Sequence, residues 1–550
     1  MSGVIPQFYV AVLSLSFWRN IEIFATATPP NIVFILADDL GYRDVGYHGS
    51  TAIKTPTIDR LAYSGVRLEN YYVQPICTPS RSTLLSGRYP IHVGLQHNSI
   101  DPCQPYSLPI QFPTVADALH NAGYATHMVG KWHIGHYAEE LVPTRRGFDS
   151  FFGYLNLQED YFFHRYCLSL DRTILNSMQY QKLLKLNKVN VIKSLYDKNW
   201  CGFDLSPRNE ELAMNSSGHY STHLYTQKAI DVISTHASQQ DIKPFFLYVA
   251  YQAPHRPVQV PESYTKQYEF IKDENRRIYA GMMTCMDEGV LNITTALEKY
   301  DLWNNTILIF STDNGGSTKN SGNNWPLRGQ KKTLWEGGIK AVGFVHSPLL
   351  KKRGTVNSGL IHISDWFPTV IALAGGNTTG LNLDGYDVWK SITDGDPSPR
   401  KQILHNIDSL SPKHGFLWNI SDFDNRVQSA VRVGNWKLIT GQPGDPDNEM
   451  SNSWIAPPED TNIHTVYATD PEWKNIWLFD IDSDPLEKTD LFESHQDIAV
   501  DLLKRLAEYD ATAVPPRDPL NDLRCRPELH NGFFSPWRQL TENHQAKAPP

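Results

Sequence analysis

The chain has 550 residues, which is more than one domain usually holds, so two domains are expected. Hydrophobic residues make up 41% of the sequence and charged residues 20%, as in ordinary globular proteins. The formal net charge of −9 argues against a general nucleic-acid-binding protein, which would carry a basic surface.

Residues 1–27 are predicted to be a secretory signal peptide. Residues 8–18 (FYVAVLSLSFW) are apolar but too short to span a bilayer, and residues 25–27 (ATA) offer a cleavage site of small side chains. An uncleaved anchor or a buried segment is the alternative. No other run approaches transmembrane length, so stable insertion in a membrane is not expected.

Residues 28–397 are predicted to form an α/β catalytic domain, because unbroken apolar runs alternate with helix patterns. The predicted buried strands are residues 31–37, 66–73, 124–129, 244–250, 306–310 and 341–346. The predicted helices are residues 56–64, 79–86, 115–122, 225–236, 275–300 and 365–374. This alternation predicts a mostly parallel sheet covered by helices on both faces. Residues 155–221 are polar and irregular, and are expected to be a long excursion with little core.

Residues 398–550 are predicted to form a smaller α+β domain with a short antiparallel sheet. Strand-like pieces at residues 431–440 and 476–480 precede one amphipathic helix at residues 499–509. The tail after Phe534 is polar and rich in proline, and is expected to be loose.

Residues 75–88 (PICTPSRSTLLSGR) place Cys77 at the start of a short helix, with Pro79 suited to its beginning and Gly87 to its end. Free backbone N–H groups at a helix N-terminus favour an anion, so Cys77 is a candidate reactive residue in an anion site. A buried structural cysteine, or one half of a disulfide, fits this stretch equally well.

Polar, titratable side chains follow four of the predicted strands. They are Asp38 and Asp39, Lys131 and His133, His255, and Asp313 and Asn314. In open parallel sheets, ligands bind at the edge formed by the carboxyl ends of the strands. Asp and Asn are also common turn residues, and a lone His is often structural, but unrelated turns need not carry this mix of residue types.

The oxygen ligands among these residues point to a hard cation. Asp38, Asp39, Asp313 and Asn314 offer carboxylate and amide oxygens, which suit Ca²⁺ or Mg²⁺. A zinc site would contain more His or Cys ligands.

The cations and histidines point to an anionic substrate. Arg81, Lys131 and Lys331 can hold an oxyanion, and His133 and His255 can move protons near neutral pH. Together with a metal and an unusual cysteine, they describe a hydrolase that acts on an oxyanion ester.

Several segments resemble one enzyme family. Residues 77–81 (CTPSR) with residues 85–89 (LSGRY) resemble the type I sulfatase signature, and residues 130–133 (GKWH) are similar to the second sulfatase motif. The same likeness is carried by residues 143–149 (PTRRGFD), 323–329 (NNWPLRG), 334–338 (LWEGG) and 362–366 (HISDW). The chain therefore resembles the formylglycine-dependent type I sulfatases over most of its length. Within that family, the resemblance is to arylsulfatase B (N-acetylgalactosamine-4-sulfatase) and its relatives.

The resemblance implies an alkaline-phosphatase-like fold and a modified active-site residue. It implies that Cys77 is oxidised to formylglycine in the endoplasmic reticulum by the formylglycine-generating enzyme. It also implies one Ca²⁺ held by Asp38, Asp39, Asp313, Asn314 and the modified residue 77. The residues that it assigns to the sulfate pocket are Arg81, Lys131, His133, His255 and Lys331. Lys332 departs from the pattern of close relatives, which leaves open whether Lys331 or Lys332 faces the pocket.

Other features agree with a secreted or lysosomal protein. Sequons for N-glycosylation stand at Asn215, Asn292, Asn304, Asn377 and Asn419. Six cysteines are too few for a disulfide scaffold, but enough for one or two bridges in an oxidising compartment. The resemblance implies that Cys103 pairs with Cys525 and Cys167 with Cys201, and that Cys285 stays a buried thiol.

The mechanism that the resemblance implies begins with a hydrated aldehyde at residue 77. One hydroxyl of this diol attacks sulfur, His255 with Lys331 donates a proton to the leaving alcohol, and His133 helps the second hydroxyl to expel sulfate from a covalent sulfo-enzyme. The substrate is either a sulfated sugar or a small-molecule sulfate such as a glucosinolate, steroid or aryl sulfate. A phosphoesterase on the same fold and a non-catalytic secreted binding protein are the rival functions.

Overall fold

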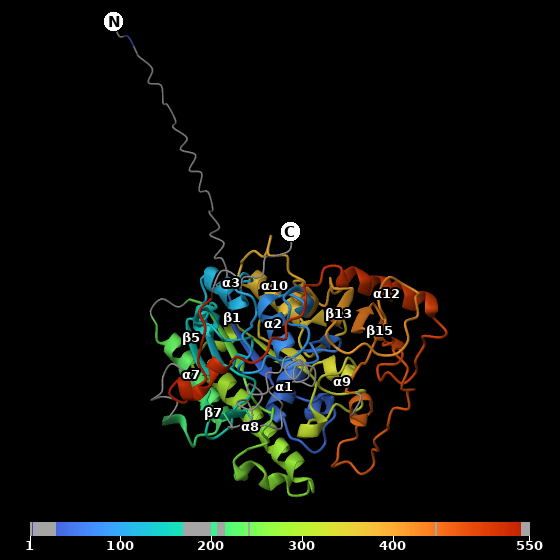
Figure 1. Cartoon of the computed structure of the whole chain (residues 1–550). Coiled ribbons are helices and arrows are strands. Elements are labelled where there is room, and N and C mark those ends of the chain that lie inside the picture. Colours follow the sequence, from blue (N-terminus) through green and yellow to red (C-terminus); the bar gives the residue numbers. More distant parts are fainter. Residues whose placement is uncertain are drawn as a thin grey trace.

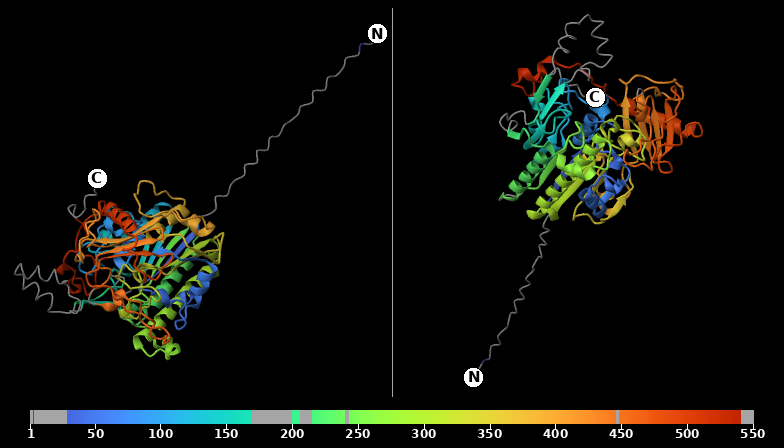
Figure 2. Two further views of the ribbon diagram at one scale, coloured as in Figure 1. Left: turned by 90° about the vertical axis from the view of Figure 1, so that its right-hand side faces the viewer. Right: turned by 90° about the horizontal axis from the view of Figure 1, so that it is seen from below.

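The computed structural model describes Gly3 and residues 29–168, 200–205, 215–239, 243–445 and 448–540. The predicted signal peptide lies outside the described residues except for Gly3. Two β-sheets organise the described part of the chain, a large one built mainly from the first two thirds of the sequence and a smaller one from the last third (Figures 1 and 2).

The large sheet has eight strands and is mostly parallel. Its strands, in spatial order, are β11 (Thr355–Asn357), β2 (Val66–Leu68), β10 (Gly343–His346), β9 (Thr306–Thr312), β1 (Asn31–Ala37), β8 (Phe245–Ala250), β4 (Ala125–Lys131) and β5 (Ser150–Tyr154). β1 is parallel to both of its neighbours, β8 and β9, whereas β10 runs antiparallel to β9 and β2. The predicted fold class is confirmed.

Helices cover both faces of this sheet, as the unbroken apolar strands predict. Successive side chains of β1 point to opposite faces, so Phe34 joins one core and Ile35 the other. The helices α2 (Cys77–Ser86), α3 (Val115–Asn121) and α10 (Trp366–Leu373) cover the Phe34 face. The helices α1 (Pro56–Ser64), α7 (Ser221–Ala237) and α8 (Glu274–Lys299) cover the Ile35 face.

The small sheet has four antiparallel strands. They are β13 (Gln402–Asp408), β14 (Gln428–Val433), β15 (Trp436–Thr440) and β16 (Ile476–Asp480). Leu502, Leu503 and Leu506 of α12 (Gln496–Asp510) pack on one of its faces, as the amphipathic pattern predicts. Trp335, from the loop before α9 (Glu336–Ile339), packs on the other face. The domain boundary at residues 397 and 398 stays a prediction.

Two strand predictions are wrong in extent. Residues 66–73 form β2 and the separate β3 (Tyr71–Tyr72), because β3 leaves the large sheet to pair with β12 (Ile361–His362). Residues 431–440 form a hairpin, not one strand, because the chain turns at Gly434, whose φ of 58° suits glycine. Lys131 is the last residue of β4, not a residue beyond it.

Two predictions of loose structure are also wrong in part. In the excursion, β6 (Arg165–Leu168) and β7 (Trp200–Phe203) pair with each other, and Tyr161 and Leu205 are buried in the core. Residues 169–199 and 206–214 lie outside the described residues. In the tail, the backbone N–H of Trp537 donates to the carbonyl oxygen of Tyr137, so the chain stays packed at this point.

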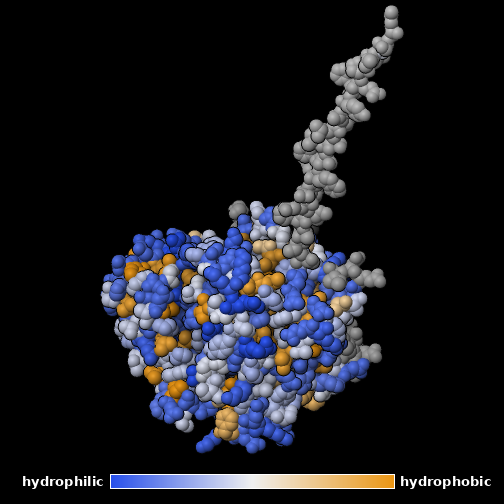
Figure 3. All heavy atoms as spheres, turned by 180° about the vertical axis from the view of Figure 1, so that it is seen from behind, coloured by the Kyte–Doolittle hydropathy of each residue, from blue (hydrophilic) through white to orange (hydrophobic). Residues whose placement is uncertain are grey.

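The cysteines follow the pairing that the resemblance implies. Cys103 is bonded to Cys525 and Cys167 to Cys201, while Cys77 and Cys285 are buried free thiols. The five sequon asparagines are all exposed. Among the described residues, no helix combines the length and the apolar character that a membrane span requires. On the face shown in Figure 3, hydrophobic side chains are scattered among hydrophilic ones.

Candidate active site

The carboxyl ends of β1, β4, β8 and β9 lie at one edge of the large sheet. β1, β8 and β9 are parallel neighbours, and β4 is parallel to β8. Asp38 and Asp39 directly follow β1, and Asp313 and Asn314 directly follow β9. The structure therefore brings the residues at these strand ends to one place, as the sequence predicts.

Cys77 lies among these residues as the first residue of α2. Its sulfur is 3.6 Å from Asp38 Oδ1 and 3.2 Å from Lys331 Nζ. Burial raises the pKa of the Cys77 thiol to about 12, although the charges of Lys131 and Lys331 act in the opposite direction. Burial therefore favours the neutral thiol in the unmodified cysteine, and the reactivity of residue 77 stays a prediction.

The local sequence determines the backbone conformation around Cys77 and Lys131. α2 begins at Cys77, two residues earlier than predicted, because proline is tolerated in the first turn and Pro79 stands there. Gly87, with φ of 67°, ends the helix. A Cβ at Gly130 would lie 1.9 Å from the carbonyl oxygen of Ala250, so only glycine allows β4 to approach β8 directly before Lys131.

Arg81 and Lys131 contact carboxylates behind the thiol. Arg81 Nε donates to Asp313 Oδ2 at 3.0 Å, and Arg81 Nη2 lies 2.9 Å from the same oxygen. Lys131 Nζ lies 2.5 Å from Asp38 Oδ2. All four side chains are fully buried. In this arrangement the two cations position the carboxylates, and direct contact of either cation with sulfate stays a prediction.

Lys331, not Lys332, faces the thiol. Lys331 Nζ contacts both Asp39 Oδ1 and the sulfur of Cys77, and its side chain is 12% exposed. Burial alone would lower the pKa of Lys331, but the charges of Asp39 and Cys77 raise it above its ordinary value. The side chain of Lys332 is exposed. Lys331 is thus the lysine that contacts residue 77, whereas Lys332 lines the cavity in front of it.

The two histidines are buried beside the same residues. His133 Nδ1 has no hydrogen-bond partner among the described residues, and His255 Nε2 lies 3.6 Å from Asp39 Oδ2. Nε2 of His133 lies 3.0 Å from the carbonyl oxygen of Ile100, and Nδ1 of His255 lies 2.7 Å from that of Arg256. A carbonyl only accepts, so these nitrogens carry the protons and leave His133 Nδ1 and His255 Nε2 with lone pairs. Burial lowers the pKa of both rings well below the ordinary value. Both imidazoles are therefore neutral near neutral pH, and each keeps a lone pair that can accept a proton.

The oxygen donors at this edge fit a hard cation. Asp39 Oδ2 and Asn314 Oδ1 are buried and have no hydrogen-bond partner among the described residues. Ligand atoms of Asp38, Asp39, Cys77 and His255 all lie within 4.8 Å of one another. Unpartnered buried oxygens are costly unless a cation or a donor meets them, so this set suits a bound metal ion. His255 lies close enough to be a further candidate ligand, which the sequence did not predict.

Asp313 is the least available of the predicted ligands. Its Oδ1 accepts the backbone N–H of Asp39 at 3.2 Å, and its Oδ2 accepts from Arg81. Burial, followed by the charge of Asp38, raises the pKa of Asp313 to about 6. Its role as a ligand stays a prediction.

A cavity of about 730 Å³ opens in front of this edge. Cys77, His133, His255 and Lys331 all contribute to its wall. Most of the remaining wall is polar, and includes Asn98, Ser99, Gln104, Asn320, Asn448, Ser451 and Asp518. The reacting groups are therefore accessible to a polar substrate, although most of them are buried.

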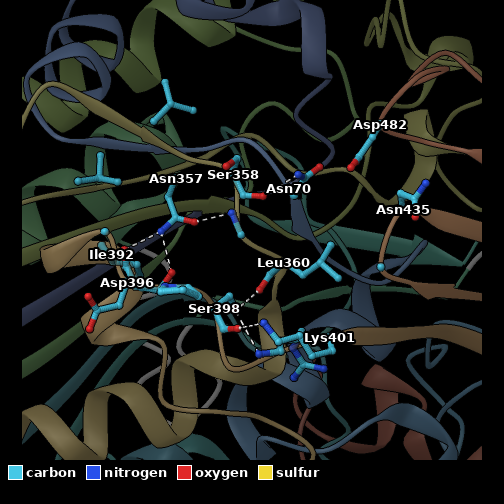
Figure 4. Close-up of a pocket in the computed structure, with 18 of the residues that line it drawn as sticks. Asn70, Asn357, Ser358, Leu360, Ile392, Asp396, Ser398, Lys401, Asn435 and Asp482 are labelled. Carbon is cyan, nitrogen blue, oxygen red and sulfur yellow. Dashed lines mark hydrogen bonds between the residues drawn. The ribbon is translucent and has the colours of Figure 1, made fainter.

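A larger cavity, of about 890 Å³, lies elsewhere, between the β2–β11 edge of the large sheet and the β13–β14 side of the small one. Its polar side chains are held within the wall: Asn357 Nδ2 donates to the backbone and side-chain oxygens of Ser391, and Ser398 Oγ donates to the carbonyl oxygen of Leu360 (Figure 4). None of the described residues in its wall belongs to the constellation predicted from sequence. Size alone thus does not identify the reactive site.

Sequence reasoning missed most of the cavity wall. Asn98 and Gln104 come from the segment after α2, whereas Ser451 and Asp518 come from the last hundred residues of the chain. Such residues show no periodicity and follow no buried strand, so no local pattern marks them. The one available signal is the disulfide implied between Cys103 and Cys525, which brings the last segment to this edge.

Comparison with known proteins gives concordant results. Residues 30–376 match the family model described as Sulfatase. Arylsulfatase J of Mus musculus is 46% identical over 538 residues, covering 95% of this chain and 83% of the relative. N-acetylgalactosamine-6-sulfatase of Rattus norvegicus is 30% identical over 517 residues, covering 90% of this chain and 88% of the relative.

Solved structures share the fold. The crystal structure of Ps i-CgsB in complex with k-i-k-neocarrahexaose aligns with a TM-score of 0.68 at 27% identity, covering 92% of this chain and 98% of that chain. A phosphonate monoester hydrolase of Agrobacterium radiobacter aligns with a TM-score of 0.55 at 16% identity, covering 88% and 96%, which shows a common fold alone. A particular closeness to arylsulfatase B stays a prediction.

Proposed function

Because the chain belongs to the sulfatase family and is a sulfuric ester hydrolase, we propose that it releases sulfate from a sulfated saccharide. We further propose that the reacting group is a formylglycine formed from Cys77, beside a bound Ca²⁺. The observation that carries this proposal is the position of Cys77, which lies between the ammonium group of Lys331 and the oxygens of Asp38 at the floor of a polar cavity.

The proposed metal would be held by Asp38, Asp39, Asn314 and residue 77, with Asp313 close behind. The buried oxygens of Asp39 and Asn314 that lack partners support this assignment. A Ca²⁺ ion there would supply positive charge that favours an ionised hydroxyl and an anionic ester. Asp38, Asp39 and Asp313 are paired with the cations Lys131, Lys331 and Arg81, so the formal charges of these side chains cancel. A bound Ca²⁺ would therefore give the site a net positive charge.

The proposed formylglycine supplies, once hydrated, one hydroxyl to attack sulfur and a second whose deprotonation releases sulfate. The chain's own residues then move the protons. Lys331, an ammonium directed at residue 77, donates a proton to the leaving oxygen, and His255 can do so from Nε2 only after it is protonated. His133 Nδ1 carries a lone pair and accepts the proton of the second hydroxyl.

A sulfated saccharide is proposed because the cavity wall consists mainly of hydrogen-bonding side chains. Ile76 and Leu157 are the apolar side chains among the described residues that line it, and none of these residues is Phe, Tyr or Trp. An aryl or steroid sulfate would leave these polar groups poorly matched, whereas sugar hydroxyls can pair with them. Similarity to Ps i-CgsB, whose structure holds a neocarrahexaose, and to an N-acetylgalactosamine sulfatase supports the same class. Glucosinolate, steroid and aryl sulfates are the alternative substrates.

We also propose that the protein matures in the secretory pathway and acts in the lysosome or outside the cell. Two disulfides and five exposed sequons support this route. The formylglycine-generating enzyme would be its partner during maturation.

One experiment tests the proposed function. The protein from a secreting eukaryotic host is offered matched pairs of sulfate and phosphate esters, namely nitrocatechol sulfate with nitrocatechol phosphate and N-acetylgalactosamine 4-sulfate with its phosphate. We expect sulfate release with a formylglycine-containing peptide around residue 77. Preferential phosphate release would favour the phosphoesterase, and an unmodified thiol without turnover would favour the binding protein.

A further inference from the structure

One short segment, residues 155–161, joins the two histidines of the candidate active site. At its beginning, the carbonyl oxygen of Leu155 accepts the backbone N–H of His133 at 3.2 Å. At its end, the hydroxyl of Tyr161 donates to the carbonyl oxygen of His255 at 2.8 Å. The segment therefore holds the backbones of both histidines in one frame.

Two buried side chains fix the backbone of this segment. The carboxylate of Asp204 accepts the backbone N–H groups of Leu155 and Asn156, at 3.1 and 3.0 Å. The side-chain amide of Gln252 donates to the carbonyl oxygen of Glu159 at 2.8 Å and accepts its N–H at 3.0 Å. Asp204 and Gln252 are both fully buried. Buried bonds of this kind are costly to break, so they hold the segment in one conformation.

Both backbone polar groups of His255 are occupied. Its N–H donates to the carbonyl oxygen of Gln252 at 2.8 Å, and its carbonyl oxygen accepts from Tyr161. In the ring, Nδ1 lies 2.7 Å from the carbonyl oxygen of Arg256, and Nε2 lies 3.6 Å from Asp39 Oδ2. These contacts together determine the direction in which Nε2 points.

The hydroxyl of Tyr161 is itself held in place by the core. Tyr161 is fully buried, and its ring stacks on that of Tyr220, with 5.2 Å between the ring centroids and 18° between the ring planes. Tyr161 does not belong to the wall of the cavity in front of the site. Its effect on a substrate must therefore pass through His255.

We propose that Tyr161 is a positioning residue for His255, which it holds so that Nε2 reaches the oxygen of the leaving group. As the bond from sulfur to this oxygen breaks, the electron pair stays on the oxygen, which takes a proton from Nε2 and leaves as an alcohol. Nε2 receives that proton from solvent in the cavity, and His255 shares the task of donating it with Lys331. This inference rests on the proposed sulfatase reaction.

Two esters with different leaving groups test the inference. The 4-nitrophenolate ion is weakly basic and leaves without a proton, whereas phenolate, whose phenol has a pKa of about 10, leaves more readily when it is protonated. Tyr161→Phe removes only the hydroxyl. It should lower kcat/KM for phenyl sulfate about tenfold more than for 4-nitrophenyl sulfate, because a displaced His255 transfers its proton less effectively. A merely structural loss would lower both values by the same factor.

Tyr220→Phe is the matched control. Tyr220 is buried in the same stack, and its hydroxyl also donates at 2.8 Å, to the carbonyl oxygen of Gln259. This variant should change kcat/KM for the two esters by the same factor. In a His255→Ala background, Tyr161→Phe should no longer change the ratio of the two kcat/KM values. Both Tyr→Phe variants keep their stacked rings, and thermal midpoints verify folding.

Three results would overturn the inference. They are equal losses for the two esters in Tyr161→Phe, an equally selective loss in Tyr220→Phe, and a selective effect of Tyr161→Phe that persists without the side chain of His255. Absence of sulfate release from both esters by the wild type would instead overturn the proposed function.

Discussion

The ammonium nitrogen of Lys331 lies 3.2 Å from the sulfur of Cys77 and also contacts a carboxylate oxygen of Asp39. This contact joins the loop before α9 to the first residue of α2, which are 254 residues apart in sequence. A cation fixed at this distance from the reacting residue can stabilise negative charge as it develops on the ester, without reorganisation during the reaction.

Substitution of Lys331 is therefore expected to reduce catalysis far more than substitution of its neighbour. Lys331→Ala should lower kcat/KM for nitrocatechol sulfate by about 10²–10³, the usual effect of removing one preorganised group. Lys332→Ala should lower it by less than about tenfold, because that side chain is exposed. Steady-state kinetics on both variants gives the comparison. A larger loss in Lys332→Ala would show that the loop is turned the other way in the working enzyme.

Cys77 and Cys285 form a second matched pair, since both are buried free thiols. Cys77→Ser should abolish multiple turnover, because a serine hydroxyl cannot replace the two hydroxyls of a hydrated aldehyde. Cys285→Ala should keep turnover at a lower thermal midpoint, because it removes a core side chain on α8 far from the cavity wall. Mass spectrometry of the peptide around residue 77 provides a second readout. Repeated turnover by Cys77→Ser would exclude the formylglycine route.

The sequence was sufficient to predict the framework of the site. β1, β8 and β9 each contain a continuous apolar run, which is typical of strands buried on both faces of a parallel sheet. The polar residues directly after them could therefore be placed at one edge before any geometry was known. The neighbouring motif residues came from family resemblance, not from periodicity.

The sequence was not sufficient to predict the contacts within the site. That Arg81 binds Asp313 and Asp38, not the open cavity, depends on side-chain directions that no pattern encodes. That burial raises the pKa of the Cys77 thiol also depends on packing around it. Asn406 Nδ2 donates to the carbonyl oxygen of Gln96, more than 300 residues away in sequence, and only the packed structure reveals this contact.

Removal of divalent cations is expected to lower both activity and stability. A cation that binds only the folded state stabilises it by about 2.7 kcal/mol at a concentration a hundred times its dissociation constant. Treatment with EGTA should lower the thermal midpoint, and Ca²⁺ should restore it. Asn314→Ala, which removes one unpartnered oxygen, should weaken the response, whereas Asn320→Ala, in the cavity wall, should not. An unchanged midpoint in EGTA, with full activity, would exclude a loosely bound ion.

The pair formed by His97 and Asp408 predicts a pH-dependent stability. Burial alone would lower the pKa of His97, but the hydrogen bond and charge of Asp408, with the charge of Asp518, raise it above its ordinary value of 6.5, and Lys332 opposes them. A histidine with a raised pKa in the folded state contributes its full stability below about pH 6.5, and loses it as the pH rises through the folded value.

As the pH rises above about 6.5, the thermal midpoint of the wild type should therefore decrease by roughly 2 °C more than that of His97→Gln. His120→Gln is the control, because His120 lies 3.2 Å from Asp149 but is 55% exposed. Parallel pH profiles for the wild type and His97→Gln would show that this pair does not contribute.

A buried lysine holds the small sheet against the loop that carries Lys331. Lys437 Nζ, on β15, lies 2.9 Å from Glu336 Oε1 and 2.7 Å from Glu487 Oε1, and all three side chains are fully buried. Lys437→Met would leave two carboxylates buried without a cation, which should destabilise the protein by about 3–5 kcal/mol.

The control for this prediction is an exposed pair of similar length. Lys351 lies 2.9 Å from Asp394, but its side chain is 71% exposed, so Lys351→Met should change stability by less than about 1 kcal/mol. Thermal midpoints measured at one scan rate compare the two variants.

Burial raises the pKa of Glu487 to about 7, so protonation at lower pH should relieve part of the loss in Lys437→Met. The difference between the variants should therefore be larger at about pH 7.5 than at about pH 5. Equal midpoints for Lys437→Met and Lys351→Met would mean that solvent reaches the carboxylates and that the small sheet does not depend on this contact.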